Sequence, residues 1–318
     1  MKKFLVALAS LLLCVCANAQ TFPAKPIRLI VTYPPGGGAD LMARLVSPRM
    51  AEALGQPVVV ENKPGASGQI GAAEVARAAP DGYTLMLDAL NYAVNPSLYP
   101  NLPYDPAKAF TPIAVLALYP NMLVVTPSFP ARDVKELIAI AKAKPGTVAF
   151  ASSGNGSAQH LSGELFRQKA GIDMTHIPYK GGGPALNDVI GGQVPVFFAN
   201  MASGLAHVKG GKLRALAITG TKRSPALPEA PTMAEAGVPG YEVYEWNAIF
   251  APAGTPAPVV AKIADAISRA TQSAEFRERV TSLGGEITGY GPAEAARFVR
   301  EQTELWGKVV REGRIKVE

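Results

Sequence analysis

Hydrophobic positions in this chain alternate between short continuous apolar runs and longer segments with apolar residues at helical spacing. In the first part of the chain the continuous runs cover residues 29–33, 58–60 and 83–87. Between the first two runs the apolar residues recur near helical spacing, at Leu41, Leu45, Met50 and Leu54. Continuous runs are typical of strands buried on both faces, and the spaced pattern is typical of an amphipathic helix. Strands alternating with helices predict a parallel sheet.

Signals for helix ends agree with this order. Asp40 stands where an N-cap is expected, and Gly55 stands where a glycine ends a helix. Ser67 is expected to cap a second helix that runs to Ala78.

Two extended runs without helix caps, residues 110–126 and 241–251, flank a self-contained alternation of helices and strands. We predict these helices over 133–143, 157–170 and 184–190, and these strands over 148–151, 175–179, 194–198 and 213–219. The extended runs are expected to cross between two lobes, with tail helices over 258–270 and 292–310 packed on the first. In such sheets the loops at the carboxyl ends of the strands hold the ligand, so the two sets of loops are expected to face one another across a cleft.

Three predicted strands lead into glycine-rich loops that open helices. The loops are 34–40 (PPGGGAD), 152–157 (SSGNGS) and 180–184 (KGGGP). A helix N-terminus leaves backbone N–H groups unpaired and carries partial positive charge, and glycine lets those groups approach an oxyanion closely. Three such loops predict that the protein captures a carboxylate or a phosphate.

The first residues have the pattern of a secretory signal peptide. Lys2 and Lys3 precede an apolar stretch over 4–15, and Ala17-Asn18-Ala19 fits a cleavage site. We therefore expect export to the periplasm with cleavage after Ala19. Both cysteines, Cys14 and Cys16, lie in this leader, so the mature chain would contain no disulfide.

Composition and motif spacing argue against several other functions. Lys and Arg number 31 against 25 acidic residues, with no basic run interleaved with aromatics, so no nucleic-acid partner is expected. The sequence contains no dinucleotide fingerprint, P-loop or G-x-S-x-G elbow, and its histidines, His160, His176 and His207, lack metal-ligand spacing. We expect no catalytic residues, metal or cofactor. His176 and His207 are interpreted as structural, whereas for His160 a structural and a binding role are both open.

Six segments resemble the Bug family, the periplasmic substrate-binding receptors of tripartite tricarboxylate transporters. They are 33–40 (YPPGGGAD), 55–62 (GQPVVVEN), 79–85 (APDGYTL), 178–181 (PYKG), 211–216 (GKLRAL) and 251–256 (APAGTP). The resemblance implies a type II periplasmic-binding-protein fold, in which two α/β lobes are joined by two crossing strands with a ligand cleft between them. It also implies a small carboxylate ligand with bridging waters, membrane transporter subunits as partners, and a monomer.

By position, the resemblance divides the chain into a signal peptide (1–19), a first lobe (20–118), a second lobe (119–246) and a return to the first lobe (247–318). The first lobe would bind the water-bridged end of the ligand, and the second lobe would hold its other polar groups. The implied ligand-binding residues are Tyr33, Gly38, Ala39, Asp40, Asn91, Ser152, Ser153, Gly156, Ser157, His160, Tyr179, Lys180, Gly182, Asn200 and Met201.

Two departures from the family bear on the ligand. After the third strand, where relatives have small polar residues, this chain has a bulkier stretch over 87–92 that begins Leu87-Asp88. Asn200 stands where relatives often have an aspartate. Because Asn200 is neutral, we expect a carboxylate without an amino group. The alternative to transport is a receptor that delivers its closed form to a membrane sensor kinase, and the sequence does not separate the two.

Overall fold

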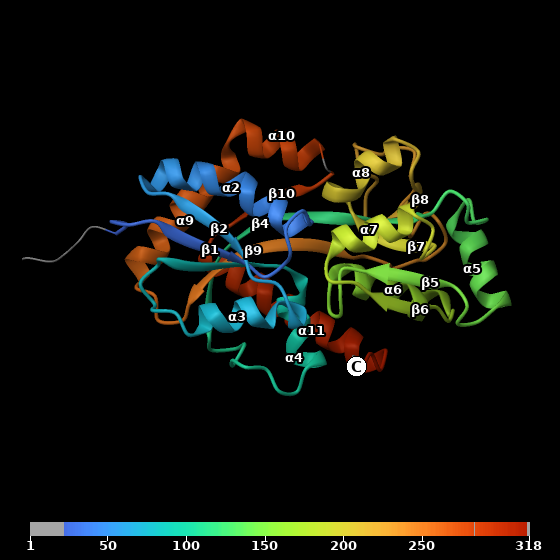
Figure 1. Ribbon diagram of the computed structural model, residues 1–318, viewed down its shortest axis with the longest axis horizontal. Coiled ribbons are helices and arrows are strands. Elements are labelled where there is room, and N and C mark those ends of the chain that lie inside the picture. Colours follow the sequence, from blue (N-terminus) through green and yellow to red (C-terminus); the bar gives the residue numbers. More distant parts are fainter. Residues whose placement is uncertain (1–21, 283, 317–318) are drawn as a thin grey trace, which may run out of the picture.

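Two long antiparallel strands, β4 (Phe110–Val125) and β9 (Tyr244–Pro252), run between two α/β lobes in the computed structural model (Figure 1). The structure describes residues 22–282 and 284–316, so the predicted signal peptide lies outside the described residues. None of the described helices is long and apolar enough to cross a membrane. β4 and β9 are the two crossing strands that the extended runs predict.

The first lobe contains the parallel sheet that the first apolar runs predict. β1 lies between β2 and β3 and pairs with both in parallel, and β3 pairs antiparallel with β9. Besides β4 and β9, the strands of this lobe are β1 (Ile27–Val31), β2 (Val58–Asn62), β3 (Thr84–Asp88) and β10 (Glu286–Tyr290). Its helices are α2 (Gly38–Leu54), the 3-10 turn η1 (Ala66–Gly68), α3 (Gln69–Ala76), α4 (Leu90–Leu98), α9 (Ala257–Gln272), α10 (Ala274–Ser282) and α11 (Pro292–Glu312).

The second lobe has the same construction. Its strands are β5 (Ala149–Ser152), β6 (Thr175–Pro178), β7 (Val196–Asn200) and β8 (Arg214–Ile218). Its helices are α5 (Val134–Ala143), α6 (Ala158–Ala170), α7 (Gly182–Ile190) and α8 (Met201–Lys209). β5 pairs in parallel with β6 and β7, so the loops after these strands emerge at one edge.

β4 belongs to both sheets. Its first part pairs with β9 and β10 in the first lobe, and its residues from Asn121 to Val125 pair with β7 and β8 in the second. Nearly every residue of β4 and β9 is buried, which explains their almost continuous apolar sequence. The predicted lobe boundaries at 118/119 and 246/247 fall inside these strands.

Two predicted helix caps were wrong. α2 begins after Gly37, and Asp40 lies in its first turn, where the carboxylate accepts a hydrogen bond from the Gly36 N–H at 3.0 Å. Ser67 has a left-handed backbone with φ 54° and does not cap α3, whose N-cap is Gly68. The Ser67 hydroxyl instead contacts the Tyr99 hydroxyl at 2.7 Å. The C-terminal glycine of α2 was predicted correctly, since Gly55 is left-handed with φ 70°.

Four elements were not predicted: α4, α8, α10 and β10. α4 covers most of the bulky stretch at 87–92 and contains Pro96, which breaks the helical pattern in the sequence. α8 begins directly at the end of β7, so no loop separates strand and helix, and its cap Asn200 is also the last residue of the strand. The short α10 buries only Phe276 and Val280, which is too weak a pattern to stand out.

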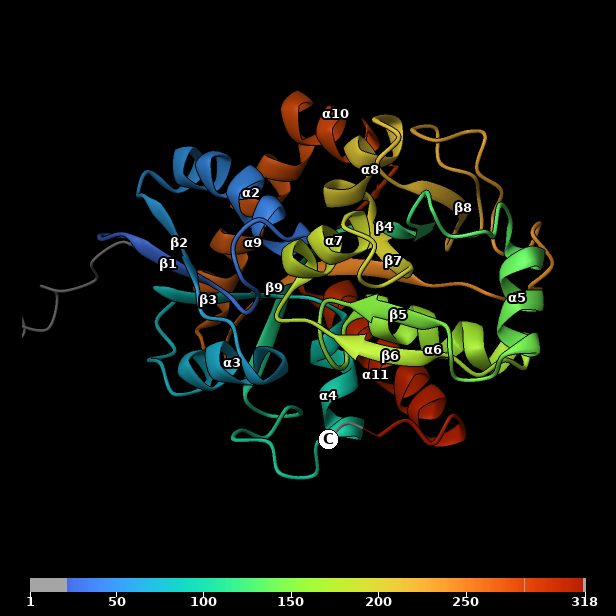
Figure 2. The same cartoon turned by 45° about the vertical axis from the view of Figure 1, so that its right-hand side comes forward.

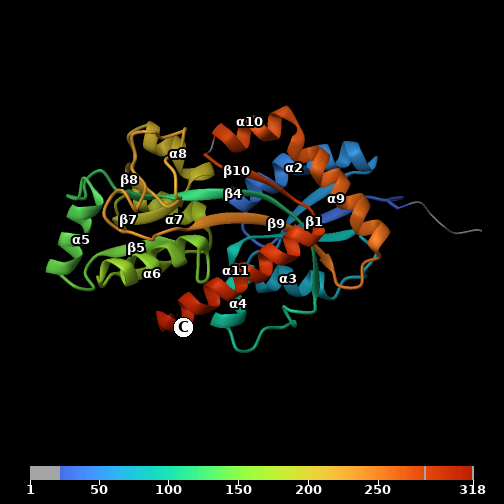
Figure 3. The same ribbon diagram turned by 180° about the vertical axis from the view of Figure 1, so that it is seen from behind.

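α11 lies across the back of the crossing strands (Figure 3). Its buried residues include Ala295, Val299 and Trp306, which recur on one face. In the same region the fully buried Trp246 of β9 makes an edge-to-face contact with Phe298 at 5.7 Å between ring centroids. This packing ties the C-terminal helix to the strands that link the lobes.

Candidate functional site

The loops that follow β1, β5 and β6 approach one another between the lobes (Figure 2). With residues 64–68 and Asn91 they line an open cavity of about 630 Å³, which is within the usual range for small-molecule sites. Residues from both lobes line it: Thr32, Tyr33, Pro34, Pro64, Gly65, Ala66, Ser67, Gly68, Asn91, Ser153, Gly154, Asn155, Ser157, Pro178, Tyr179, Lys180 and Gly181.

A second, smaller cavity lies beside the first. Its volume is about 20 Å³, enough for about one water molecule. Its lining also comes from both lobes: Tyr33, Pro34, Gly37, Gly38, Ala39, Ser153, Gln159, Gly182, Phe197, Asn200, Ser203 and Glu245. Tyr33, Pro34 and Ser153 line both cavities, so the two are neighbouring parts of one cleft.

The lobes touch each other around this cleft. A Cβ on Gly181 would collide with the ring of Pro34, and a Cβ on Gly38 would lie 2.9 Å from the Asn200 amide nitrogen. A Cβ on Gly156 would lie 3.3 Å from the Asn95 Oδ1. Glycine at these positions therefore lets each lobe approach the other closely, as an enclosed ligand site requires.

Two helices, one from each lobe, begin at the cleft without a side-chain cap. α2 of the first lobe starts after Gly37, and α7 of the second lobe starts after Gly181. Gly37 and Gly38 line the smaller cavity, as does Gly182 at the start of α7. Two uncapped helix N-termini on opposite walls present unpaired N–H groups and partial positive charge to whatever lies between them. Such a cleft favours an anion.

In the first lobe, Tyr33 and Asn91 are held in place by their own hydrogen bonds. The Tyr33 hydroxyl donates to Asn91 Oδ1 at 2.6 Å, and Asn91 Nδ2 donates to the Ser67 carbonyl at 2.8 Å. Asp40, by contrast, lines neither cavity. Its carboxylate accepts hydrogen bonds from Gly36, Arg44 and Asn62, which together hold its pKa below the usual range although burial opposes them. Asp40 therefore stabilises the glycine loop from behind.

The second glycine loop is largely satisfied internally. The Ser152 hydroxyl contacts His176 Nε2 at 2.6 Å, and the Gly156 N–H donates to His160 Nδ1 at 3.1 Å. The Ser157 hydroxyl caps α6, accepting the His160 N–H at 3.2 Å and donating to the Gly154 carbonyl at 2.7 Å. These groups hold the loop, and the Gly156 amide that we expected at the ligand is already paired.

His160 and His176 form a stacked pair beneath that loop, with ring centroids 4.0 Å apart. Burial lowers the pKa of His160 well below its usual range and the pKa of His176 to about 4, and each ring is therefore neutral at neutral pH. His160 lines neither cavity, which favours a structural role for both rings.

The third loop contributes Lys180, the one cationic side chain among the described residues that line the two cavities. Tyr179 beside it donates its hydroxyl to Asp188 at 2.7 Å, and burial followed by this carboxylate raises the pKa of Tyr179 to about 12. A ligand in the larger cavity would thus meet one ammonium group.

Sequence reasoning missed a buried carboxylate in the smaller cavity. Glu245 of β9 is 6 % exposed, and its Oε2 accepts hydrogen bonds from Gln159 Nε2 and Asn200 Nδ2, each at 2.7 Å. Burial raises the pKa of Glu245, and the two amide donors offset this only in part. The available signal is the one charged residue of the crossing strand β9.

Ten of the residues implied by the family resemblance line the two cavities. They are Tyr33, Gly38, Ala39, Asn91, Ser153, Ser157, Tyr179, Lys180, Gly182 and Asn200. The structure places Asp40, Ser152, Gly156, His160 and Met201 outside both linings. Ligand contact remains a prediction for all of them, since the cavities define only which side chains a ligand can reach.

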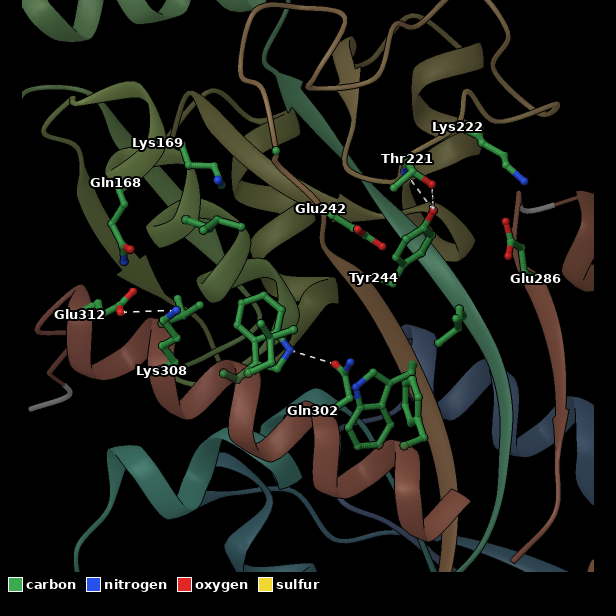
Figure 4. A pocket seen from close by; sticks show the side chains of 18 residues that line it. Gln168, Lys169, Thr221, Lys222, Glu242, Tyr244, Glu286, Gln302, Lys308 and Glu312 are labelled. Atoms are coloured by element: carbon green, nitrogen blue, oxygen red, sulfur yellow. Dashed lines mark hydrogen bonds and ion pairs between the residues drawn. The ribbon is translucent and has the colours of Figure 1, made fainter. Parts of the chain in front are cut away.

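A larger hollow, of about 730 Å³, lies behind the crossing strands (Figure 4). Tyr244 and Gln302 lie on one side of it, from β9 and α11, and Gln168 and Lys169 of α6 lie on the other. Its charged lining residues are of both signs: Lys169, Lys222, Lys308, Glu242, Glu286 and Glu312. Among the described residues, the lining of this hollow includes no helix N-terminus. The inter-lobe cleft is therefore the better candidate for an anion site.

The described residues contain no group of three or more His, Cys, Asp or Glu side chains that could hold a metal ion. Together, two α/β lobes, two crossing strands and an anion-favouring cleft define a two-lobed binding protein of the periplasmic type. A family model described as "Tripartite tricarboxylate transporter family receptor" matches residues 42–315. The chain belongs to this family, TctC, whose members are binding receptors and not enzymes.

Individual relatives agree over nearly the whole chain. Protein BugT of Bordetella pertussis is 40% identical over 297 residues, 93% of this chain and 91% of BugT. A structure from R. palustris with adipate is 37% identical with a TM-score of 0.89, covering 93% of this chain and 99% of that one. MatC from Rhodopseudomonas palustris with bound malate is 36% identical with a TM-score of 0.87, covering 91% and 100%. The predicted fold and the Bug family resemblance are thereby confirmed.

Proposed function

We propose that this protein captures a small carboxylate in the periplasm and delivers it to the membrane subunits of a tripartite transporter. The observation that carries the proposal is the pair of uncapped helix N-termini, α2 and α7, on opposite walls of one cleft. Their partial positive charges and free amides suit a carboxylate held mainly by neutral donors. Structures of two relatives contain adipate and malate, both dicarboxylates. The leader over residues 1–19 supports export.

Capture would proceed by closure about β4 and β9. Apart, the lobes admit the ligand, and as they approach, the loops at Pro34 and Gly181 cover it. Because a single lysine, Lys180, lines the described cleft, most of the binding would come from amides and hydroxyls. Such bonds are individually modest, which keeps release possible at the membrane.

A thermal-shift screen of mono- and dicarboxylates tests the capture step. A ligand present at about 100 times its dissociation constant adds about 2.7 kcal/mol to the free energy of unfolding, which is readily seen as a higher melting temperature. Stabilisation by at least one carboxylate, and none by matched amides, is expected. A flat response to all carboxylates contradicts the proposal.

Deletion of the gene tests the delivery step. Uptake of the bound carboxylate into cells is expected to fall strongly without the receptor and to return when it is supplied again. Unchanged uptake, combined with loss of a transcriptional response to the same carboxylate, would instead support the sensor-kinase alternative.

A further inference from the structure

The smaller cavity brings opposite electrostatic features together. The N-termini of α2 and α7 face it through Gly38 and Gly182 and favour a negative group. Glu245 lines the same cavity and is itself a carboxylic acid. A ligand carboxylate next to an ionised Glu245 would be repelled, because two like charges in a buried site cannot both remain ionised at low cost.

The orientation of the groups around Glu245 is fixed. Asn200 Oδ1 accepts the Ala202 N–H at 2.8 Å as the N-cap of α8, so its Nδ2 points toward Glu245. Gln159 Nε2 donates to the same oxygen, Oε2. Both neighbours are neutral, and among the described residues no Lys or Arg forms an ion pair with Glu245. Both hydrogen bonds end on Oε2, and Oε1 accepts none from the described residues, so Oε1 can accept a further donor.

We propose that Glu245 determines specificity by accepting a hydrogen bond from a donor on the carbon next to the ligand carboxylate. The inference rests on the proposed function, carboxylate capture in this cleft. The donor is placed next to the carboxylate because Gly38 and Gly182, at the two helix N-termini, line the same cavity as Glu245, so a carboxylate bound at those N-termini lies beside Glu245. The ligand class is thus a 2-hydroxy or 2-amino carboxylic acid.

The position of Glu245 changes the interpretation of Asn200. A neutral residue at the start of α8 suggested a ligand without an amino group. The structure places the Glu245 carboxylate 2.7 Å from the Asn200 amide, so the crossing strand supplies the negative group that the loop lacks. A hydroxyl and an ammonium group can each donate a hydrogen bond to Glu245, and the ligand series below distinguish the two.

Two matched ligand series test the inference by calorimetry. Succinate, malate and aspartate differ only in the group on carbon 2, as do glutarate, 2-hydroxyglutarate and glutamate. In at least one series a 2-substituted acid is expected to bind at least about tenfold more tightly than the unsubstituted acid, equivalent to about 1.4 kcal/mol. Malate above aspartate would identify a hydroxyl donor, and the reverse an ammonium donor.

The variant Glu245→Gln keeps the shape of the side chain and removes its charge. The preference for the 2-substituted acid is expected to fall at least about fivefold, and the unsubstituted acid is expected to bind as well as or better than before. Glu242→Gln is the matched control, because Glu242 lines the hollow behind the strands and not the cleft. It is expected to leave all affinities unchanged.

The outcomes are distinguishable. If unsubstituted acids bind the wild-type protein as tightly as substituted ones, or if Glu245→Gln leaves their ratio unchanged, the role of Glu245 is wrong while carboxylate capture stands. If no carboxylate in either series binds and the wider screen is also flat, the proposed function fails and the inference falls with it. Circular dichroism and a melting curve confirm that Glu245→Gln is folded.

Discussion

The two faces of β9 carry opposite kinds of side chain and serve opposite purposes. Glu245 faces the inter-lobe cleft, where it meets only amides, whereas its neighbours Tyr244 and Trp246 face the hollow behind the strands. Successive side chains of a strand point to opposite faces, so a polar binding site and an aromatic support lie one residue apart. The cleft side of β9 therefore serves recognition, and the side packed against α11 serves stability.

The largest expected effect is on the back face. Trp246 is fully buried, and Trp246→Ala is expected to lower the free energy of unfolding by about 3–5 kcal/mol, because it leaves a large cavity beneath α11. Urea unfolding measures this loss. The conservative Trp246→Phe is expected to cost much less, since the Trp246 Nε1 has no hydrogen-bond partner among the described residues. A loss below about 1 kcal/mol for the alanine variant would remove the distinction between the two faces.

The next largest effect is expected where the lobes meet at the cleft. Gly38→Val would place a side chain against the Asn200 amide, where even a Cβ lies only 2.9 Å away. We expect affinity for the carboxylate to fall at least about 100-fold, equivalent to about 2.7 kcal/mol, because the lobes can no longer approach. Gly183→Ala is the matched control, since a Cβ there meets nothing within 4 Å. Equal losses in both variants would argue against inter-lobe contact as the cause.

A pH effect is expected from Asp88, which lies buried at the end of β3. Its Oδ1 accepts hydrogen bonds from the Thr32 hydroxyl and the Ala89 N–H, yet burial raises its pKa to about 7. Between the unfolded pKa near 4 and pH 7 the folded state holds a proton that the unfolded state has lost, so this contribution to stability falls as pH rises. The fall is expected to be at most about 1.4 kcal/mol per pH unit.

Asp88→Asn isolates that contribution. His160 and His176 act in the opposite direction, because their lowered pKa values make folding less favourable as pH falls below about 6.5. The difference in unfolding free energy between variant and wild type removes these shared terms. We expect the variant to gain stability relative to wild type as pH rises from 5 to 8, and a constant difference would show that Asp88 is ionised throughout.

The smallest effect is expected at the rim of the rear hollow. In α11, Lys308 Nζ lies 3.8 Å from Glu312 Oε1, and both side chains are mostly exposed. Lys308→Ala is expected to change the free energy of unfolding by less than about 0.5 kcal/mol and to leave ligand affinity unaltered. A tenfold change in affinity would mean that the rear hollow takes part in closure, and the two faces would no longer be independent.

Much of the fold could be predicted because it depends on local pattern. The apolar runs at β1, β4 and β9 and the glycine at Gly55 each give a signal that needs no distant partner. α4 and α8 are not predicted because a proline interrupts the first and no loop separates the second from the strand before it. Their helical form depends on packing against the rest of the lobe.

Some features of the candidate site can likewise be predicted from the sequence, and others depend on packing. The glycine loops, and the residues Tyr33, Ser153 and Lys180 within or beside them, follow from sequence, because loops at strand ends in an α/β sheet converge by topology. The internal pairing of Gly156 with His160 and the support that Asp40 gives its own loop do not, since a hydrogen bond is decided by which groups lie within about 3 Å.

The two-lobed α/β architecture, the receptor family and the glycine loops that favour an anion can be predicted from the sequence, because periodicity and loop composition are properties of consecutive residues. Which of those groups face the cleft depends on the packing of segments that are distant in the chain. Glu245, Gln159 and Asn200 are separated by 86 and 45 residues along the chain, yet they meet at 2.7 Å. No local pattern encodes that meeting; the packing of one lobe against the crossing strand creates it.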